Sequence, residues 1–575
     1  MTAEVRLSPD HESVEIFSIS GEDVVSILHS VAPDLRARTS RSGGLRISFV
    51  DAAELLGVAS LDWASDAERA VVNRAGVRDR APWVGVEAEV IRSADVEALR
   101  SRLRGSGLAE VLDLHQLRNV ALMTVEGGWG TCIFDEQGTG KTPTVIAAFD
   151  LLVERNEADS LVVVSPKSMV GEWAEEFRRF CGELYRVVTI EGSRRERAAA
   201  LAAGADVVIL NYEAAITLAE DLRLLASRSR VILAVDESFN VKNPDAARTA
   251  AISELREWCS RCFVLCGTPA PNAPRDLVSQ VDLVDFGMTF GELSLTGDPE
   301  QDREPIRAAL ESRGFFTRNL KHQVLPHLPD RRFAELAIEF SPEQGRLYSR
   351  ALDGLISDLK QADDASFRLD QLSFSERRSV LLRLCSNPAG VFPAYAEIPG
   401  KVVALDQLLE HQAESGEKVV LWSFYRASLD FLAERYTDYG IARIDGSIQD
   451  VGARREAVRR FQEDDETRVF LGNPAAAGAG LTLHRAALAI YESFSNQAAH
   501  FMQSLDRIHR RGQERDVEYI VLLCEGSLEE VEYERILRKV ELQADVLGDP
   551  KPYRPTREAL LEELVGARDR LTLRS

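Results

Sequence analysis

Residues Asp135-Glu136-Gln137-Gly138-Thr139-Gly140-Lys141-Thr142 form the stretch that decides the fold class of this chain. A short apolar run at residues 131–134 precedes it, and a helix-like run at residues 145–148 follows it. This order of strand, glycine loop and helix is typical of a nucleotide triphosphate site. The loop therefore predicts ATP or GTP binding, with a plain glycine-rich turn as the alternative, since Asp135 replaces the usual first glycine.

The residue types of this loop suit phosphate chemistry. Glycines such as Gly138 and Gly140 let backbone N–H groups, including that of Thr139, wrap the phosphates. Lys141 can reach the β- and γ-phosphates, and Thr142 can hold Mg²⁺.

Length and composition indicate a soluble protein with several domains. A chain of 575 residues is too long for a single core. Its 45% hydrophobic and 28% charged residues are ordinary for a globular protein, and no segment approaches the ~20 apolar residues of a membrane span. Residues 1–5 carry no basic-then-apolar signal, and seven cysteines without a paired framework suggest a reducing compartment. We therefore expect a cytoplasmic protein with no membrane partner.

The net charge of −23 argues, taken alone, against a nucleic-acid partner. An average over the whole chain says little about local patches, however, and basic residues gather at residues 313–332 and 507–515. Nine of the 69 basic residues are lysines, which leaves 69 − 9 = 60 arginines. Together with the many alanines and valines, this ratio indicates a GC-rich genome, bacterial or phage.

Short apolar runs predict two α/β lobes. Near-continuous apolar runs are typical of parallel strands that are buried on both faces. The first set lies at residues 161–164, 207–210, 231–235 and 263–266, and the second at residues 419–422, 468–471, 488–491 and 519–523. We expect an N-terminal accessory domain (1–108), a first lobe (109–285), helical insertions with an interlobe linker (286–395), a second lobe (396–545) and a helical tail (546–575).

Two acidic residues, Asp236 and Glu237, close the apolar run at residues 231–235. The carboxyl end of a parallel strand is where ligands bind in α/β sheets. We predict that Asp236 holds Mg²⁺ through water and that Glu237 orients or deprotonates the attacking water. A solvated strand end is the alternative, and the phosphate loop upstream argues against it.

Arg507 and Arg510 lie three residues apart in a basic stretch that begins at Gln503. This spacing predicts that both project from one face of a helix. Such a pair can reach across an interlobe cleft and stabilise transition-state charge on the γ-phosphate. A solvated basic helix is the alternative.

Ordered motifs from about residue 112 to 540 resemble those of SWI/SNF-type (Snf-family) ATPases of helicase superfamily two. The matching segments are His115-Gln116, residues 135–142, Ser165-Pro166-Lys167, Asn211-Tyr212-Glu213, residues 267–272, 317–329, 341–344 and 381–388, Gly400-Lys401, residues 445–447 and residues 478–483. The two features at residues 341–344 and 381–388 separate this family from other superfamily-two ATPases, which lack such insertions.

The resemblance implies two RecA-like parallel-sheet lobes with ATP and Mg²⁺ between them. It implies that Gln116 reads adenine, that Asp135 and Gln503 also serve the nucleotide, and that Lys141, Asp236, Glu237, Arg507 and Arg510 are catalytic. Residues implied in coupling or DNA contact are Pro166, Lys167, Tyr212, Gly267, Thr268, Ser447 and Gly480. The implied activity is translocation along duplex DNA without strand separation, close to the nucleoid.

Two positions depart from the family pattern. Phe239 stands where the family usually has a histidine that links the ATP site to the coupling motif, and Ser495 replaces an expected tryptophan. A phenyl ring cannot make the hydrogen bonds of an imidazole, so we expect weaker coupling. Cys259 and Cys262 could suggest zinc, but a single pair without a second one favours cysteines that merely flank a strand.

Three other classes remain open. A strand-separating or RNA-directed helicase is disfavoured by the insertions, and a non-catalytic scaffold is disfavoured by the intact Lys141, Glu237 and arginines. The third is a motor subunit of a repair, transcription-recycling or antiviral assembly, with residues 1–108 as the module that docks a protein partner.

Overall fold

The protein was analysed as a computed structural model. It describes residues 3–9, 13–18, 37–40, 44–58, 61–271, 273–291, 293–313, 315–361, 371–448, 450–476, 481–495 and 497–544. Gly480 and the expected tail at residues 546–575 lie outside these ranges. The chain divides into two compact units, residues 1–270 with 274–320, and residues 271–273 with 321–575.

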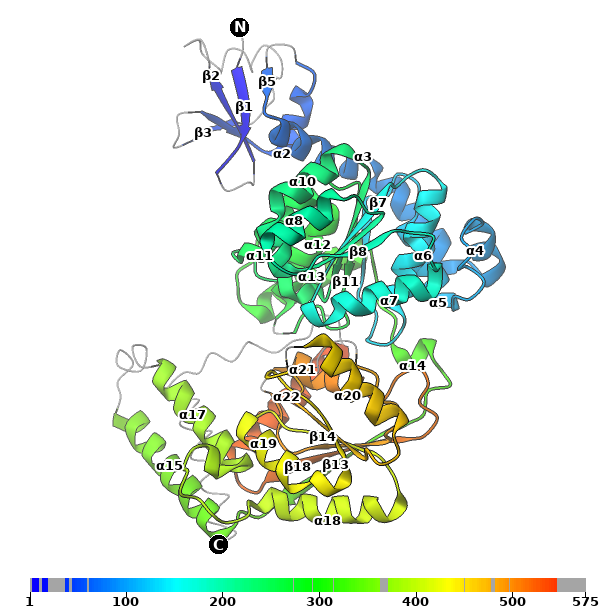
Figure 1. Cartoon of the computed structure of the whole chain (residues 1–575). Helices are drawn as coiled ribbons and strands as arrows, with labels where there is room; N and C mark the ends of the chain where they lie inside the picture. The colour runs from blue at the N-terminus through cyan, green and yellow to red at the C-terminus, as the bar shows by residue number, and fades with distance from the viewer. Residues whose placement is uncertain are drawn as a thin grey trace. The chain divides into compact units, whose positions relative to one another are not determined.

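A seven-stranded parallel sheet forms the centre of the first unit within the described ranges (Figure 1). Its order is β12 (Phe316–Thr317), β6 (Gly130–Ile133), β11 (Arg261–Leu265), β10 (Val231–Asp236), β7 (Ser160–Ser165), β9 (Val207–Asn211) and β8 (Val187–Thr189). Its central strands β7, β9, β10 and β11 are buried along their whole length, as expected for a sheet with helices on both faces.

The helices around this sheet fall into two packed groups. One contains α5 (Leu114–Met123), α6 (Lys141–Glu154) and α7 (Val170–Cys181), and the other contains α9 (Tyr212–Thr217), α10 (Ala219–Arg228), α11 (Ala247–Arg256) and α12 (Val278–Asp285). The helices α8 (Arg194–Ala202) and α13 (Pro299–Arg313) complete the described part of this lobe.

Residues before this lobe form a small mixed sheet. Its strand order is β3 (Ala37–Thr39), β4 (Leu45–Ile47), β2 (Val14–Ser18), β1 (Ala3–Leu7) and β5 (Leu61–Trp63). In the chain, α2 (Phe49–Ala52) lies between β4 and β5, and α3 (Ser65–Ser93) and α4 (Val96–Arg102) follow β5. The long helix α3 packs on the first lobe, where Arg74 pairs with Glu257 at 2.6 Å and the Arg69 guanidinium lies 4.0 Å from the ring centroid of Trp258.

A second parallel sheet forms the centre of the second unit. Its order is β13 (Arg331–Ile338), β18 (Val517–Cys524), β17 (Leu488–Tyr491), β14 (Val419–Trp422), β16 (Val469–Gly472) and β15 (Ile441–Ile444). The described helices of this unit are α14 (Lys321–Val324), α15 (Pro342–Gln361), α17 (Gln371–Ser386), α18 (Gly400–Ser415), α19 (Arg426–Arg435), α20 (Val451–Glu463), α21 (Ala498–Leu505) and α22 (Leu528–Ala544). The expected α/β class with two parallel-sheet lobes is confirmed.

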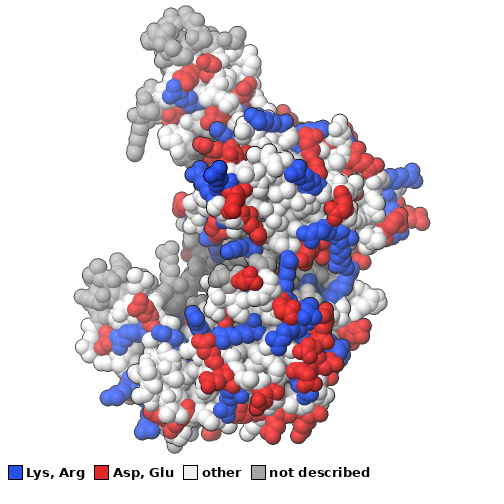
Figure 2. All heavy atoms as spheres, in the orientation of Figure 1, with Lys and Arg blue, Asp and Glu red and all other residues white. Residues whose placement is uncertain are grey.

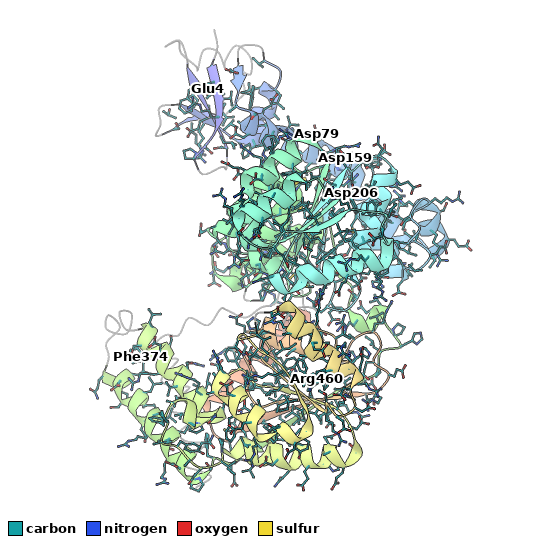
Figure 3. All side chains as sticks on the ribbon, viewed as in Figure 1. Glu4, Asp79, Asp159, Asp206, Phe374 and Arg460 are labelled. Carbon is teal, nitrogen blue, oxygen red and sulfur yellow. The ribbon has the colours of Figure 1, made fainter. Side chains whose placement is uncertain are left out.

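The expected helical insertion corresponds to α15 and α17, which pack against each other around their own apolar cluster. Phe374 of α17, labelled in Figure 3, belongs to this cluster together with Tyr348 and Leu384. Cys524 and Leu528 also belong to it, so the insertion is anchored on the end of β18 and the start of α22.

Four strands of the two parallel sheets were missing from the sequence-based expectation, namely β8, β12, β13 and β15. All four are edge strands of their sheets. The edge strand β13 keeps three exposed residues, Arg331, Arg332 and Phe333, at its start, so it lacks the continuous apolar run of a buried strand. Both β12 and β13 also lie within residues 286–395, where the sequence predicted helices and a linker.

No helix in the described part of the chain combines the length and the apolar character that crossing a bilayer requires.

Candidate nucleotide site

The shape of the phosphate loop depends on two glycines. Gly138 and Gly140 have φ angles of 82° and 90°, which lie in the left-handed region that disfavours residues with a Cβ. A Cβ at Gly140 would also lie 2.1 Å from Nε2 of Gln116. The loop leads directly into the N-terminus of α6, where free backbone N–H groups and the helix dipole favour phosphate.

Lys141 is the first residue of α6 and bends back over this loop. Its Nζ donates to the backbone oxygens of Asp135 at 2.9 Å and Glu136 at 3.1 Å. Both acceptors are neutral carbonyls, so the oxygens of a polyphosphate could replace them with stronger, charge-assisted bonds. Lys141 and its neighbour Thr142 are half-buried, which keeps both within reach of a ligand on the loop.

The side-chain amide of Gln116 forms hydrogen bonds with the protein backbone. Its Nε2 donates to the backbone oxygens of Thr139 and Gly140, each at 3.3 Å, and its Oε1 accepts from the backbone N of Asp113 at 2.8 Å. The ring of His115 also contacts the backbone oxygen of Thr139 at 2.9 Å. Gln116 therefore supports the phosphate loop from α5, and its contact with adenine stays a prediction.

Asp135 is a positioning residue of the loop. Its carboxylate is buried and accepts five hydrogen bonds, one from Asn119, one from Thr317 and three from Asn319. These donors hold the loop to α5 and to the end of β12. We predicted Asp135 to bind the nucleotide, but its side chain instead faces protein donors.

Asp236 ends β10 and lies deep at the carboxyl edge of the sheet. Its Oδ2 accepts from Nε1 of Trp173 at 2.8 Å, and its Oδ1 accepts from the backbone N of Glu237 at 2.9 Å. Burial raises the pKa of the Asp236 carboxyl, while the Trp173 bond and the charge of Lys141 act in the opposite direction.

Trp173 and Tyr212 have roles that the sequence did not predict. Both are buried, at 1% and 4% exposure, so Tyr212, which the resemblance assigns to coupling or DNA contact, has its side chain in the protein interior. The Tyr212 hydroxyl donates to the backbone oxygen of Asp236 at 2.6 Å, below the acidic pair. Together they fix the end of β10.

Glu237 is held by a residue of the phosphate loop. Its backbone adopts the left-handed conformation, with φ of 50°, and its Oε1 accepts from Nε2 of Gln137 at 2.6 Å. Gln137 also packs on Gly267, where an added Cβ would lie 2.8 Å from Cγ and 3.2 Å from the backbone N of Gln137. Gln137 thus links the loop, Glu237 and the predicted coupling motif, a role its place in the motif alone did not indicate.

Arg318 provides a second link between the loop and the coupling motif. Its Nη1 donates to the backbone oxygen of Phe134 and, at 2.9 Å, to that of Gly267. Burial lowers the pKa of this guanidinium. The sequence placed Arg318 in a linker, whereas it completes the nucleotide lobe.

The remaining coupling or DNA residues differ in exposure. Lys167 is exposed and Pro166 half-buried just after β7, whereas Thr268 is buried. Ser447 in the second unit is exposed, and its backbone N donates to Oδ1 of Asp445 at 2.7 Å. Lys167 and Ser447 can therefore meet a phosphate backbone, while Thr268 acts only through the protein interior.

The prediction that Arg507 and Arg510 share a helix face is wrong. Helix α21 ends at Leu505, with Asp506 as its C-cap, and both arginines lie in the turns that follow. The backbone N of Leu483 donates to the backbone oxygen of Arg507 at 2.9 Å, and Nη1 of Arg510 donates to that of Leu481 at 3.1 Å. Arg507 and Gln503 are buried, at 6% and 5% exposure.

Two buried residues hold this arginine segment in place. Nε2 of Gln513 donates to the backbone oxygens of His484, Ala486 and Ile508. Lys321 pairs with Asp506 and also donates to the backbone oxygen of His509 at 3.0 Å. These contacts, and not the expected helix, hold the arginines in their orientation.

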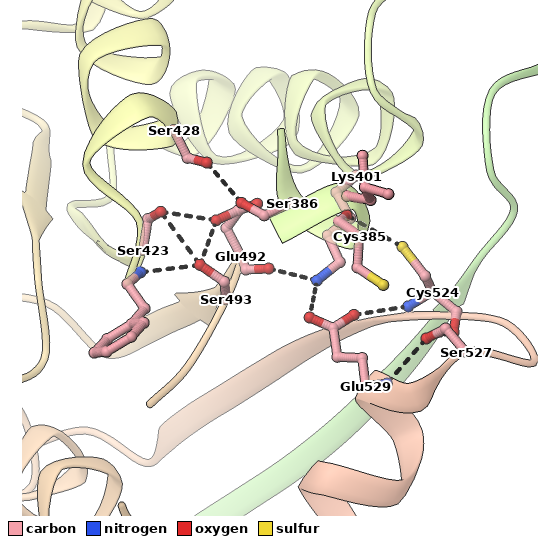
Figure 4. A network of polar contacts seen from close by, with 12 residues as sticks. Cys385, Ser386, Lys401, Ser423, Ser428, Glu492, Ser493, Cys524, Ser527 and Glu529 are labelled. Carbon is pink, nitrogen blue, oxygen red and sulfur yellow. Dashed lines mark hydrogen bonds and ion pairs between the residues drawn. The ribbon is translucent and has the colours of Figure 1, made fainter. Parts of the chain in front are cut away.

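The second unit has its own buried lysine and carboxylate group, shown in Figure 4. Nζ of Lys401, which is 0% exposed, donates to Oε1 of Glu529 and to the backbone oxygen of Glu492, both at 2.6 Å. Oε2 of Glu529 accepts from the backbone N of Cys524 at 3.1 Å. Burial alone would lower the pKa of Lys401, but the Glu529 carboxylate and nearby groups raise it above its usual value.

Cysteine placement bears on the metal alternatives. Among the described residues, ligand atoms of Cys385, Cys524 and Glu529 lie within 4.8 Å of one another, but the ammonium of Lys401 already neutralises this group. Cys259 and Cys262 are buried, and burial raises the pKa of each thiol to about 12. Protonated thiols are poor ligands for zinc.

Residues of the first unit fit ATP and Mg²⁺. Left-handed glycines, a helix N-terminus and Lys141 suit a polyphosphate, and Thr142 with Asp236 offers the oxygen ligands that Mg²⁺ prefers. Glu237 lies beside them with its carboxylate oriented by Gln137. This arrangement can bind a nucleotide triphosphate and position a water for attack.

Residues 115–387 match the SNF2-related domain, and residues 400–512 match the helicase conserved C-terminal domain. The chain contains an ATPase core of the SNF2 family. Both matches lie within the span of about residues 112–540 whose motifs predicted this family.

Several curated proteins are similar to this SNF2 chain. The ATP-dependent helicase FUN30 of Saccharomyces cerevisiae is 25% identical over 515 residues, covering 73% of this chain and 45% of that protein. A probable chromatin-remodeling complex ATPase chain of Oryza sativa subsp. japonica is 30% identical over 460 residues, covering 75% and 40%. An uncharacterized ATP-dependent helicase of Mycoplasma pneumoniae is 25% identical over 414 residues, covering 70% and 39%. The chain spans less than half of the length of these relatives.

Among solved structures, the Sulfolobus solfataricus SWI2/SNF2 ATPase core in complex with dsDNA is 21% identical. The superposition covers 79% of this chain and 96% of the Sulfolobus chain, with a TM-score of 0.35.

Proposed function

We propose that this SNF2 chain hydrolyses ATP in response to duplex DNA and translocates on the duplex without separating its strands. The observation that carries the proposal is Glu237, bonded through Gln137 to the phosphate loop that also positions Lys141. This arrangement lies within the SNF2-related domain. A scaffold without chemistry would have no use for a carboxylate held in this position.

The residues of the site divide the work. Bound ATP supplies the phosphoanhydride, and Mg²⁺ neutralises phosphate charge. Lys141 and the loop N–H groups bind the phosphates, and Thr142 with Asp236 would hold the metal. Glu237 orients the attacking water and accepts its proton. Arg507 and Arg510 of the second unit are proposed to stabilise transition-state charge when the lobes close.

Duplex DNA is the proposed partner because the family's relatives include chromatin-remodelling ATPases. Figure 2 shows that Lys and Arg are interspersed with Asp and Glu on the visible face of both units. Binding through scattered exposed cations such as Lys167 contacts phosphates and not base edges, so it carries little sequence preference. Such a protein would associate with the nucleoid of the bacterial or phage-infected cell that the arginine-rich composition indicates.

An ATPase assay tests the catalytic part. Wild type should hydrolyse ATP faster with duplex DNA, and Glu237→Gln should bind ATP but turn it over about 10²- to 10⁴-fold more slowly. The assignment of Glu237 fails if Glu237→Gln keeps wild-type turnover.

Strand displacement tests the translocation part. With ATP, the protein should remove a triplex-forming third strand from a duplex and leave a forked duplex paired. Efficient unwinding of the fork would instead support a strand-separating helicase, and stronger stimulation by single-stranded RNA would support an RNA-directed one.

We also propose that residues 1–108 dock a protein partner with an apolar face, as in a motor subunit of a larger assembly. Helix α3 exposes Trp83, Val86 and Val90 at a spacing that places them on one side of the helix. Trp83→Ser should weaken that association and leave the ATP turnover of the isolated chain unchanged.

A further inference from the structure

Gln280 of α12 is a fully buried glutamine in the nucleotide lobe. It is 0% exposed, and its side-chain amide bonds to three protein groups. Its Oε1 accepts from Oγ of Ser238 at 2.6 Å. Its Nε2 donates to the backbone oxygens of Pro269 and Asp276, both at 2.6 Å. A buried amide with short bonds in three directions is costly to leave partly unpaired.

The partners of Gln280 belong to two separate functional segments. Ser238 immediately follows Glu237, and Pro269 ends the predicted coupling motif that begins at Gly267. The two segments follow neighbouring strands, β10 and β11, which pair in parallel register. One side chain therefore joins the residue after the catalytic carboxylate to the coupling motif by two hydrogen bonds in series.

The chemistry of this link explains how the ATP site can be connected to the coupling motif without the histidine that is usual in the family. Phe239 is adjacent to Ser238 and has no hydrogen-bonding group in its side chain. Gln280 has both a donor and an acceptor, and both NH₂ hydrogens are used. A displacement of Ser238 must therefore move the amide and its bond to Pro269, or break one of the two bonds.

We propose that Gln280 is a positioning residue that couples Glu237, through Ser238, to the coupling motif in place of the histidine that Phe239 replaces, in addition to the link that Gln137 makes. This inference rests on the proposed duplex-stimulated hydrolysis. Gln280 contacts neither the nucleotide loop nor the reacting atoms, so it acts on chemistry only through Ser238 and Pro269.

The test compares Gln280→Met with wild type as full-length proteins. Methionine keeps the length of the side chain and removes the donor and acceptor. Duplex-stimulated turnover should fall at least about fivefold relative to unstimulated turnover, with KM for ATP changed less than about twofold, as expected for loss of a coupling between sites.

A matched control separates coupling from general loss of a buried amide. Gln344 in the second unit is also 0% exposed, and its Nε2 donates to the backbone oxygens of Leu384 and Cys385. Gln344→Met should lower Tm to a similar extent and keep the stimulation ratio. Equal loss of stimulation in both variants would overturn the proposal.

Hydrogen exchange gives a second readout that does not need DNA. Binding of a non-hydrolysable ATP analogue with Mg²⁺ should protect amides near Glu237 and also those of residues 266–270 in wild type. Gln280→Met should keep the first protection and lose the second. If Gln280→Met does not fold, Ser238→Ala removes one hydroxyl of the same link and should show the same separation.

The outcomes distinguish this inference from the proposed function. If wild type shows no stimulation by duplex DNA, the proposed function fails, and hydrogen exchange still decides the role of Gln280. If wild type is stimulated and both Gln280→Met and Ser238→Ala match it in stimulation and in protection of residues 266–270, the role assigned to Gln280 is wrong.

Discussion

Each lobe contains a lysine near carboxylates at the carboxyl edge of its parallel sheet, and the two lysines are used in opposite ways. In the first lobe, Lys141 is half-buried and bonds only to neutral carbonyls among its hydrogen-bond acceptors. In the second lobe, Lys401 is fully buried and paired with Glu529. One lysine keeps its charge available for a ligand, and the other uses it to hold the lobe together.

The difference teaches how similar sheet edges acquire different tasks. Lys401 at the start of α18 bonds to Glu529 at the start of α22 and to the backbone oxygen of Glu492 just after β17, so it joins two helices to the edge of the sheet. A buried charge pair of this kind is costly to break because either partner alone is left uncompensated. Lys141 is not held in such a charge pair, because its hydrogen-bond acceptors are backbone carbonyls of the glycine loop, which a phosphate can displace.

Removing the charge of Lys141 should have the largest effect. Lys141→Ala deletes the cation that binds the β- and γ-phosphates, so ATP turnover should fall at least about 10³-fold. The free energy of unfolding should change by only about 1 kcal/mol, because the two bonds that are lost go to neutral backbone carbonyls. Steady-state turnover and urea denaturation measure the two quantities. A large loss of stability would show that the two lysines are not used differently.

Arg510→Ala tests whether the second lobe also takes part in chemistry. We expect kcat to fall about 10³-fold with little change in nucleotide affinity, since an arginine finger acts mainly in the transition state. The neighbouring exposed Arg511 is the matched control, and Arg511→Ala should keep kcat. Weaker nucleotide affinity at unchanged kcat would support a basic surface instead.

Lys401→Met should mainly affect stability. It leaves Glu529 buried without its partner, and breaking such a pair costs about 3–5 kcal/mol of unfolding free energy. Chemical denaturation measures this loss. The double variant Lys401→Met with Glu529→Gln should recover part of it, because no uncompensated charge remains; no recovery would show that the ion pair is not the reason for the loss.

Asp285 provides a third arrangement, a buried carboxylate without a lysine partner. Burial raises its pKa to about 6, although Thr289 and backbone N–H groups donate to it. Because the folded pKa exceeds the unfolded value of about 3.9, this group stabilises the fold fully below about pH 4, and up to about 3 kcal/mol is lost as pH rises through about 6.

Asp285→Asn should remove this pH dependence. The stability of the variant relative to wild type should increase between about pH 4 and about pH 7, by up to about 3 kcal/mol. Burial, and then the charge of Asp285, raise the pKa of Asp282, so removing that charge in the variant changes the stability difference in the same direction. Urea denaturation at both pH values measures the difference, and a constant difference would contradict the assignment.

Phe239→His should have the smallest effect. The sequence alone predicts that restoring the histidine increases stimulation by DNA. Because Gln280 already joins Ser238 to Pro269, we expect the ratio of stimulated to unstimulated turnover to rise by less than about twofold, below the range of a typical coupling free energy. A rise of about fivefold or more would restore the view that Phe239 weakens coupling.

Several features of the molecule could be predicted from the sequence because they are local. The glycine loop, the acidic pair after β10 and the central strands each depend on a few consecutive residues. Edge strands such as β13 escaped prediction because one face is not fully buried and their apolar pattern is broken. The helix expected around Arg507 and Arg510 was wrong, because contacts with residues distant in sequence hold that segment in turns: Lys321 donates to the backbone oxygen of His509, and Gln513 donates to that of Ala486.

The sequence by itself determined the order of the motifs, the α/β class and the identity of the candidate phosphate and metal residues, since backbone angles and apolar periodicity follow from neighbouring residue types. Only the tertiary structure decided what Asp135, Gln137, Trp173 and Gln280 do. Their partners lie across the sheet or in other loops, and hydrogen bonds between distant segments leave no periodic signal in the chain. The structure also decided that the charge of Lys401 is paired with Glu529 inside the protein, whereas the charge of Lys141 stays available to a ligand. Burial and charge pairing arise from packing and not from residue type.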